Sequence, residues 1–168
     1  MEDFEEIYRN YQPEVFRFLL RITGFEPQTA EELTQETFYQ AFLSFGRFRG
    51  ECSMRTWLFQ IAKNVYAKFV RKESRQRAAV RSEEPMTAPP PAAALEQLEM
   101  LTLLRKEIAA LAEPARSIVE YRLYAEAGYP EIAELLHIKP NTAAVIYRRT
   151  VAALRKCMKE RYGYEISA

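Results

Sequence analysis

Apolar residues recur at helical spacing through the first part of the chain. Residues 4–22 carry one at every third or fourth position, which predicts an amphipathic helix with a single buried stripe. Gly24 and Pro27 interrupt this pattern. A second helix is expected to begin at Thr29, because Thr29 as N-cap and Glu32 as its partner form the capping-box pattern. Its apolar positions are Leu33, Phe38, Phe42 and Phe45.

A third helix is predicted from about Ser53, after a polar segment that contains Gly46 and Gly50. Phe59 lies outside the apolar stripe of this helix, so it is either a surface aromatic or one that contacts a base. The stripe consists of Met54, Trp57, Leu58, Ile61, Ala62, Val65 and Phe69. Three amphipathic helices of this kind predict a compact bundle that ends near residue 75.

The chain changes character between residues 76 and 93. Most of this segment lacks apolar periodicity, and it contains four prolines, Pro85, Pro89, Pro90 and Pro91. Such a composition is typical of a linker with some polyproline stiffness. We therefore expect an N-terminal domain over residues 1–75, a flexible linker over 76–98 and a C-terminal domain over 99–168.

The C-terminal domain shows the pattern of a helix-turn-helix. Apolar periodicity returns at Leu95, and Pro114 suits the first position of a further helix that Gly128 ends. A short helix from Pro130, a tight turn and a long basic helix from Pro140 then follow. The fold class is therefore predicted to be all-α, with two small helical domains joined by a flexible linker and a helix-turn-helix in the second.

Composition argues against several classes of protein. No apolar run approaches the roughly 18 residues of a membrane span, and the acidic first residues do not resemble a signal peptide. A cytoplasmic protein without membrane insertion is therefore expected. Cys52, Cys157 and His137 form neither a metal set nor a disulfide framework. With no glycine-rich phosphate loop and no credible nucleophile–base pair, the sequence predicts neither an enzyme nor a bound cofactor.

The formal net charge of +1 hides two basic blocks. Residues 1–46 hold 9 acidic and 3 basic side chains, whereas residues 47–77 hold 9 basic and 2 acidic ones. Residues 137–161 hold 7 basic side chains and 1 acidic one. Either block alone is compatible with a solvated face, but together they indicate two contacts with a polyanion and one acidic surface for another partner.

Three segments carry a more specific signal: AEELTQETFYQAF at 30–42, FRGECSMRTWLFQIAKNV at 48–65, and the helix-turn-helix segment at 111–149. In order and in residue types they resemble the extracytoplasmic-function group of the sigma-70 family. The similarity covers residues 4–72 and 100–158. Any one segment would be weak evidence, whereas three in the correct order around a linker are strong. The resemblance implies a protein that binds core RNA polymerase and promoter DNA.

The resemblance implies that the second helix grips the clamp of core RNA polymerase. Glu32, Gln35 and Glu36 project from one side of this helix and would face basic clamp helices. Leu33 and Phe38 would partly support the contact. Acidic groups that meet a basic partner steer and align docking more than they supply affinity. The alternative is a solvated acidic face.

The third helix and its preceding loop would, by the same resemblance, bind the melted −10 promoter element. Asn64 lies where the family reads an exposed base, and an amide can pair bidentately with a base edge. Phe48 and Phe59 are either walls of a pocket for a flipped base or core residues. Trp57 either packs in the bundle or stacks on bases. The residues expected to neutralise phosphates are Arg47, Arg49, Arg55, Lys63, Lys68, Arg71 and Lys72.

The helix-turn-helix would read the −35 element in the major groove of duplex DNA. Asn141 and Thr142 lie in the first turn of its long helix, where recognition helices meet base edges. The residues expected to bind phosphates or guanine are Arg148, Arg149, Arg155 and Lys156. The expected inward stripe consists of Ala143, Tyr147, Thr150, Leu154 and Met158.

The long helix departs from the family's pattern after Thr142. Ala144, Val145 and Ile146 stand where relatives carry a small polar-basic cluster, so this apolar patch either contacts thymine methyl groups or is covered by a partner. Lys139 is a poor N-cap residue. His137 stands in the turn, where relatives often have glycine, and is interpreted as a turn residue that tolerates an unusual backbone.

The predicted function is therefore that of a sigma factor that recognises −10 and −35 elements and is held inactive by an anti-sigma protein. A stand-alone helix-turn-helix regulator would explain the second half of the chain but not the first. A sigma factor with altered −35 reading is the other alternative, because of the apolar patch on the long helix.

Overall fold

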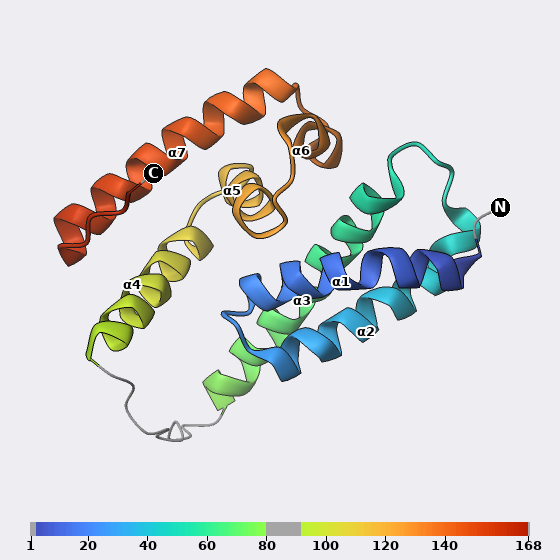
Figure 1. Ribbon diagram of the computed structural model, residues 1–168, viewed down its shortest axis with the longest axis horizontal. Coiled ribbons are helices and arrows are strands. Elements are labelled where there is room, and N and C mark those ends of the chain that lie inside the picture. The colour runs from blue at the N-terminus through green and yellow to red at the C-terminus, as the bar shows by residue number, and fades with distance from the viewer. Residues whose placement is uncertain (1–2, 80–91, 168) are drawn as a thin grey trace. The chain divides into compact units, whose positions relative to one another are not determined.

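The computed structural model describes residues 3–79 and 92–167. Within these ranges every regular element is a helix and no strand occurs, which confirms the all-α prediction. The chain divides into two compact units, Met1–Glu84 and Pro85–Ala168, which we call the N-terminal unit and the C-terminal unit (Figure 1).

Three helices and one short 3₁₀ turn build the described part of the N-terminal unit. They are α1 (Phe4–Ile22), α2 (Pro27–Ser44), η1 (Phe45–Arg47) and α3 (Met54–Ala79). Each of the three α-helices packs against the other two. The apolar stripe predicted for α1 is confirmed for Ile7, Val15, Phe18, Leu19 and Ile22, which are buried, whereas Tyr8 of the same stripe is 43% exposed.

The capping box predicted for α2 is wrong. The helix begins at Pro27, with Glu26 as its N-cap residue. Proline is favoured at this position because the backbone amides of the first turn have no hydrogen-bond partner within the helix, so the missing N–H of proline costs nothing there. Thr29 lies inside that turn and donates its hydroxyl to Glu26 Oε2 at 3.2 Å. Phe42, which was expected in the apolar stripe, is 60% exposed.

Helix α3 begins where the sequence predicts. Ser53 Oγ accepts a hydrogen bond from the Thr56 amide at 3.0 Å, which satisfies one of the amides that the first turn of a helix leaves unpaired. Phe59 is buried, and its ring meets that of Phe18 edge-on with centroids 5.3 Å apart. Phe59 therefore belongs to the core, which is the alternative that the sequence left open beside a surface or base-contacting position.

Both ends of the segment predicted as a linker are helical in the structure. Helix α3 continues to Ala79, and α4 (Ala92–Ala109) begins before the predicted end at residue 98. Both helices therefore extend into the segment 76–98. Alanine, glutamine and arginine, which are common in its two ends, are good helix formers. The prolines on which the linker prediction rests lie outside the described residues.

The C-terminal unit surrounds an aliphatic core. Helix α5 (Ala115–Tyr124) packs against α4, α6 and α7. Ile108, Val119 and Leu154 form a buried cluster, against which Leu104, Leu111, Tyr124 and Tyr147 pack. Helix α5 ends before the predicted Gly128, because the chain turns through a left-handed conformation at Glu126, whose φ is 53°.

The helix-turn-helix prediction is confirmed by α6 (Tyr129–Leu136) and α7 (Pro140–Tyr162). His137 adopts the left-handed conformation, with φ 54° and ψ 43°. The Ile138 amide then donates to the Ala133 carbonyl at 3.0 Å, which turns the chain out of α6. The predicted inward stripe of α7 is confirmed: Ala143, Thr150, Leu154 and Met158 are buried and Tyr147 is half-buried.

Candidate polymerase and nucleic-acid interfaces

One side of α2 exposes both acidic and apolar side chains. Glu32, Gln35 and Glu36 are exposed. The following turns expose three large apolar side chains, Tyr39 at 58%, Phe42 at 60% and Leu43 at 55%. At 100° per residue these six positions fall on one side of the helix, and we call them the α2 face. Acidic residues followed by exposed apolar ones are typical of a protein-binding surface.

Leu33 and Phe38 do not belong to this face. They are only 7% and 4% exposed, and the Phe38 ring packs edge-on against Tyr8 of α1, with centroids 4.8 Å apart. Their predicted contact with a partner is therefore corrected: they hold α2 in the bundle from beneath. Sequence periodicity does not make this distinction, because buried and exposed apolar residues alternate along α2.

A surface pocket of about 290 Å³ lies where α2 and η1 meet α3. The predicted −10 residues Arg47, Asn64 and Lys68 are brought together in it. Its other lining residues are Gln40, Leu43, Ser44, Ile61 and Val65. We call it the α2–α3 pocket. It combines aliphatic walls, two amides and two cations, which are the groups needed to enclose a base, pair with its edge and neutralise the adjacent phosphates.

The other predicted −10 cations lie outside the residues that line this pocket. Arg49 is exposed in the segment between η1 and α3, Arg71 and Lys72 are exposed on α3, and Lys63 is half-buried. Exposed cations near a nucleotide-sized pocket suit phosphate neutralisation, which depends on charge more than on exact geometry. The first basic block of the sequence is therefore distributed along η1, the following segment and α3.

Arg55 differs from the rest of the predicted cations. Its Nε donates to Glu14 Oε2 on α1 at 2.6 Å, and its guanidinium carbon lies 4.5 Å from the centroid of the Phe59 ring. A guanidinium that is paired and stacked in this way ties α3 to α1. These contacts give Arg55 a role in the packing of the bundle, while its role as a phosphate ligand stays a prediction.

Trp57 packs within a small aromatic cluster. Its ring lies 4.9 Å from that of Phe48 and 6.4 Å from that of Phe45, between centroids. Both Phe48 and Trp57 are half-buried. Of the two alternatives for Trp57, these contacts favour packing, with the exposed part of the cluster left beside the loop that precedes α3.

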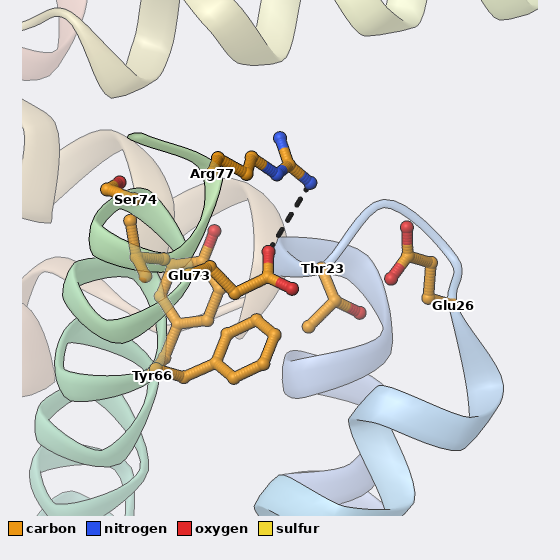
Figure 2. Close-up of a pocket in the computed structure, with 8 residues that line it drawn as sticks. Thr23, Glu26, Tyr66, Glu73, Ser74 and Arg77 are labelled. Atoms are coloured by element: carbon orange, nitrogen blue, oxygen red, sulfur yellow. Dashed lines mark hydrogen bonds and ion pairs between the residues drawn. The ribbon is translucent and has the colours of Figure 1, made fainter. Parts of the chain in front are cut away.

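A second pocket, of about 190 Å³, lies between the junction of α1 and α2 and the last turns of α3 (Figure 2). Glu26 and Glu73 line it, and Glu73 pairs with Arg77 at 3.4 Å. The Tyr66 hydroxyl donates to the Ile22 carbonyl at 3.2 Å, which ties α3 to the end of α1. Two carboxylates beside one paired arginine do not suit a nucleic-acid phosphate. This pocket therefore differs in charge from the α2–α3 pocket, which is lined by two cations and no carboxylate.

The predicted −35 residues lie along α7. Asn141 and Thr142 are exposed in its first turn, and Val145 is half-buried, as are Ala144 and Ile146. Arg148, Arg149 and Arg155 are exposed farther along the helix. Lys139 precedes the helix without a side-chain capping bond, so the free amides of this first turn, at the positive end of the helix dipole, are open to a phosphate.

A polar cluster around Glu107 ties α4 to the end of α7. The Tyr162 hydroxyl donates to Glu107 Oε1 at 2.6 Å, and Arg161 Nη1 donates to the same oxygen at 3.2 Å. The Cys157 thiol lies 3.5 Å from Glu107 Oε2. The hydrogen bond from Tyr162 is the main cause that lowers the pKa of Glu107, and the same bond raises the pKa of Tyr162.

Sequence reasoning missed several residues of these sites. Tyr39, Leu43 and Gln40 were not assigned a role, although Tyr39 and Leu43 follow Glu32, Gln35 and Glu36 at helical spacing. Glu14 and Glu107 were also missed. Both glutamates bind partners that lie at least 41 positions away in the sequence. No local sequence pattern therefore indicates these partners.

The fold and these sites define an all-helical protein with a helix-turn-helix, a class that binds DNA, and a second helical unit with a basic pocket. A family model described as Sigma-70 region 2 matches residues 7–76. The RNA polymerase sigma factor YlaC of Bacillus subtilis (strain 168) is 30% identical over 161 residues, which cover 94% of this chain and 92% of YlaC. The chain therefore belongs to the sigma-70 family of RNA polymerase sigma factors, which act in transcription initiation.

Other comparisons agree with this assignment. The ECF RNA polymerase sigma factor SigM of Bacillus subtilis (strain 168) is 30% identical over 149 residues, covering 86% of this chain and 88% of SigM. The fold resembles CnrH, solved in complex with the cytosolic domain of CnrY, with a TM-score of 0.64, 17% identity and coverage of 94% and 88%. It also resembles the sigma factor RpoE from Bartonella quintana, solved with the anti-sigma factor NepR, with a TM-score of 0.62, 20% identity and coverage of 96% and 99%. Within the described ranges, no helix is long and apolar enough to cross a membrane.

Proposed function

We propose that the α2 face is the surface through which the N-terminal unit binds core RNA polymerase. Glu32, Gln35 and Glu36 are exposed beside three exposed apolar side chains of the same helix. Acidic groups would align the protein on a basic partner, while the apolar groups would supply the buried centre of the interface. In this arrangement Leu33 and Phe38 act from the core, by holding the helix that carries the face.

The α2–α3 pocket is the proposed site for an unpaired base of the −10 element. Asn64 would hydrogen-bond the edge of the base, and Arg47 and Lys68 would neutralise the flanking phosphates. Trp57 packs on Phe48, and the exposed part of the half-buried Phe48 ring is the proposed surface on which a neighbouring base can stack. Arg49, Lys63, Arg71 and Lys72 extend the positive charge along the N-terminal unit.

Helix α7 is the proposed reader of the −35 element. The exposed Asn141 and Thr142 stand at the helix end that enters a major groove in helix-turn-helix proteins. Arg148, Arg149 and Arg155 would contact phosphates or guanine. The half-buried Val145 would reach a thymine methyl group through its exposed part, and this apolar contact would distinguish the protein from a sigma factor with a polar recognition helix.

An anti-sigma protein is the proposed regulator. RpoE of Bartonella quintana was solved with the anti-sigma factor NepR, and the similarity of fold supports the same kind of control for this chain. Such a partner would compete with core polymerase if it covered the exposed apolar residues of the α2 face. By this proposal the free protein acts in the cytoplasm.

One observation carries the proposal for the N-terminal unit: the exposed acidic residues and the pocket lined by Asn64 lie on adjoining parts of α2 and α3. The test is run-off transcription with core polymerase on a promoter pool, with and without the chain. We expect new start sites that are lost with Glu32→Lys/Glu36→Lys, because a reversed charge repels a basic clamp. Control variant Glu5→Lys, at an exposed position of α1, should retain them.

A stand-alone helix-turn-helix regulator is the competing function. It would bind promoter DNA without joining the polymerase as a stoichiometric subunit. Size-exclusion chromatography of the chain with core polymerase separates the two functions. If the chain elutes apart from core and produces no new start sites, the proposal that it binds core polymerase is wrong.

A further inference from the structure

Gln40 connects the two candidate surfaces of the N-terminal unit. Its side chain lines the α2–α3 pocket together with Asn64. Its Nε2 also donates to Glu36 Oε1 at 2.7 Å, and Glu36 is an exposed member of the α2 face. One hydrogen bond therefore connects the proposed polymerase surface with the proposed pocket for a base.

The walls of the pocket offer two amides from opposite helices. Asn64 comes from α3 and Gln40 from α2, and the aliphatic side chains of Leu43 and Ile61 lie on the same two walls. The Ser44 hydroxyl already donates to the Gln40 carbonyl at 2.7 Å, so its proton is committed to the backbone of α2. The Gln40 amide has two N–H groups, of which Glu36 accepts from one, so Gln40 is the α2 side chain best equipped to donate to a ligand in the pocket.

We propose that Gln40 is a specificity-determining residue for the unpaired base, and that Glu36 restrains its amide until a cationic group of core polymerase engages that carboxylate. The inference rests on the proposed function, since it needs both the polymerase surface and the base pocket. It adds a residue to base reading and a physical link between polymerase binding and DNA reading.

The competition at Glu36 follows from the strengths of the two kinds of hydrogen bond. A neutral amide donor binds a carboxylate less strongly than a guanidinium or ammonium group does, because the latter bond is charge-assisted. A cation that docks on Glu36 would displace the Gln40 amide or weaken its bond. The released amide can then present its N–H and carbonyl groups together to a base edge, as an adenine requires.

The first test selects promoters with holoenzyme reconstituted from core polymerase and the full chain. The probe is a DNA library that carries a preformed bubble with randomised bases. We expect Gln40→Leu to reduce the preference at one bubble position about tenfold, as the loss of a bidentate amide contact predicts. Gln40→Met, which keeps the length of the side chain, should have the same effect. Gln28→Leu replaces an exposed glutamine in the first turn of α2 and should leave the preference unchanged.

The second test uses the free chain and the best bubble sequence from that selection. Glu36→Ala should release Gln40 and increase the preference of the free chain for this sequence over its single-base variants by about twofold, as the small free energy of an exposed i,i+4 hydrogen bond predicts. The increase should disappear in Glu36→Ala/Gln40→Leu. If Glu36→Ala leaves the preference of the free chain unchanged, the restraint by Glu36 does not exist and the proposal is overturned.

The result for Asn64→Ala distinguishes this inference from the function on which it rests. A changed preference with Asn64→Ala but not with the two Gln40 variants would overturn the role of Gln40 and leave the base pocket in place. An unchanged preference with all three variants would overturn the base pocket itself. A preference changed by both residues, at the same or neighbouring bubble positions, supports the inference.

Discussion

Asn64 and Asn141 are both exposed, but Asn64 lines a surface pocket between two helices of the N-terminal unit, whereas Asn141 lies on the first turn of one helix of the C-terminal unit. The difference corresponds to the state of the DNA that each is proposed to read. An unpaired base has two free faces and must be enclosed to be recognised. The edges of paired bases lie in a groove, and an exposed helix end can reach them.

The interactions that stabilise the interior of each unit also differ between the two units. In the N-terminal unit, a cation of α3 crosses to a carboxylate of α1, and aromatic rings meet in the core. In the C-terminal unit, aliphatic side chains fill the centre and a carboxylate of α4 collects donors from the end of α7. A pocket between helices requires that their separation be fixed, so interactions across the N-terminal bundle bear on DNA reading as well as on stability.

The largest expected effect separates the two reading modes. Asn64→Ala should reduce the preference for one base of the −10 element by about 1–3 kcal/mol, as expected for a lost bidentate contact, and leave −35 preference unchanged. Asn141→Ala should do the reverse. Sequencing of promoters selected by each holoenzyme measures both preferences. A change in −35 preference with Asn64→Ala would contradict the division of labour between the units.

A smaller effect is expected from the pair between α1 and α3. Arg55→Met should lower the free energy of unfolding of the N-terminal unit by about 1 kcal/mol, because it removes a partly buried ion pair and a stacked guanidinium. Denaturant unfolding followed by Trp57 fluorescence measures this. The control Arg9→Gln breaks the exposed pair between Arg9 and Glu5, whose side chains are 73% and 74% exposed, and should change stability by only a few tenths of a kcal/mol.

The same variant tests whether Arg55 also binds DNA. A phosphate ligand contributes about one unit to the slope of log affinity against log salt concentration. We expect Arg55→Met to leave this slope unchanged, whereas Lys68→Met, in the α2–α3 pocket, should reduce it. A reduced slope with Arg55→Met would instead support the phosphate contact that the sequence predicts for Arg55.

Sequence periodicity predicted most of the fold because the buried positions of α1 and α7 recur at regular spacing, whereas the buried Phe59 of α3 lies outside the stripe that the sequence predicts. It was wrong for α2 at Thr29, where Pro27 determined the start of the helix. The two basic blocks fall mainly on the segment from η1 to α3 and on α7, where most of their cations are exposed, and the polyanion contacts that they indicate stay predictions. They did not distinguish Arg55 from the others, because its partner Glu14 lies 41 positions away and only the packing of α3 on α1 brings the two together.

The pocket was beyond sequence reasoning for a similar reason. Asn64 was predicted as a base-reading residue because it lies in a segment that resembles the family's −10-binding segment. Gln40 and Ser44 belong to a helix for which the sequence predicted polymerase binding alone. A pocket wall formed by two helices depends on the rotation of each about its axis. The side chains that fill the interface set that rotation, and no local pattern reports it.

A pH dependence is expected mainly in the C-terminal unit. The folded pKa of Glu107 is lowered from its ordinary value of 4.5, chiefly by the hydrogen bond from Tyr162. The stabilisation is therefore present above that ordinary value and is lost as the pH falls through the lowered folded pKa. Glu107→Gln should lose stability at neutral pH and show a weaker dependence on acid than the wild type. Unfolding at pH 7 and at about pH 4 measures this.

A matched carboxylate serves as the control for that experiment. Glu160 lies on the exposed side of α7, with its carboxylate 3.9 Å from the Lys156 ammonium group. Glu160→Gln should leave both the stability at neutral pH and its dependence on acid close to those of the wild type, because an exposed pair contributes little. Equal acid dependence in Glu107→Gln and in the wild type would show that the cluster does not stabilise the docking of α4 on α7.

The smallest expected effect concerns one turn in each unit. His137 and Phe25 are non-glycine residues with positive φ, 54° and 63°, a conformation that is unfavourable for residues with a Cβ. His137→Gly should stabilise the C-terminal unit by about 0.5 kcal/mol, because relief of this strain exceeds the entropy that glycine adds to the unfolded chain. Phe25→Gly should gain less, since the ring is 61% exposed and its covered part also contributes. Thermal unfolding of both variants measures which substitution increases stability more. If His137→Gly is destabilised, the imidazole makes a compensating contact in the turn.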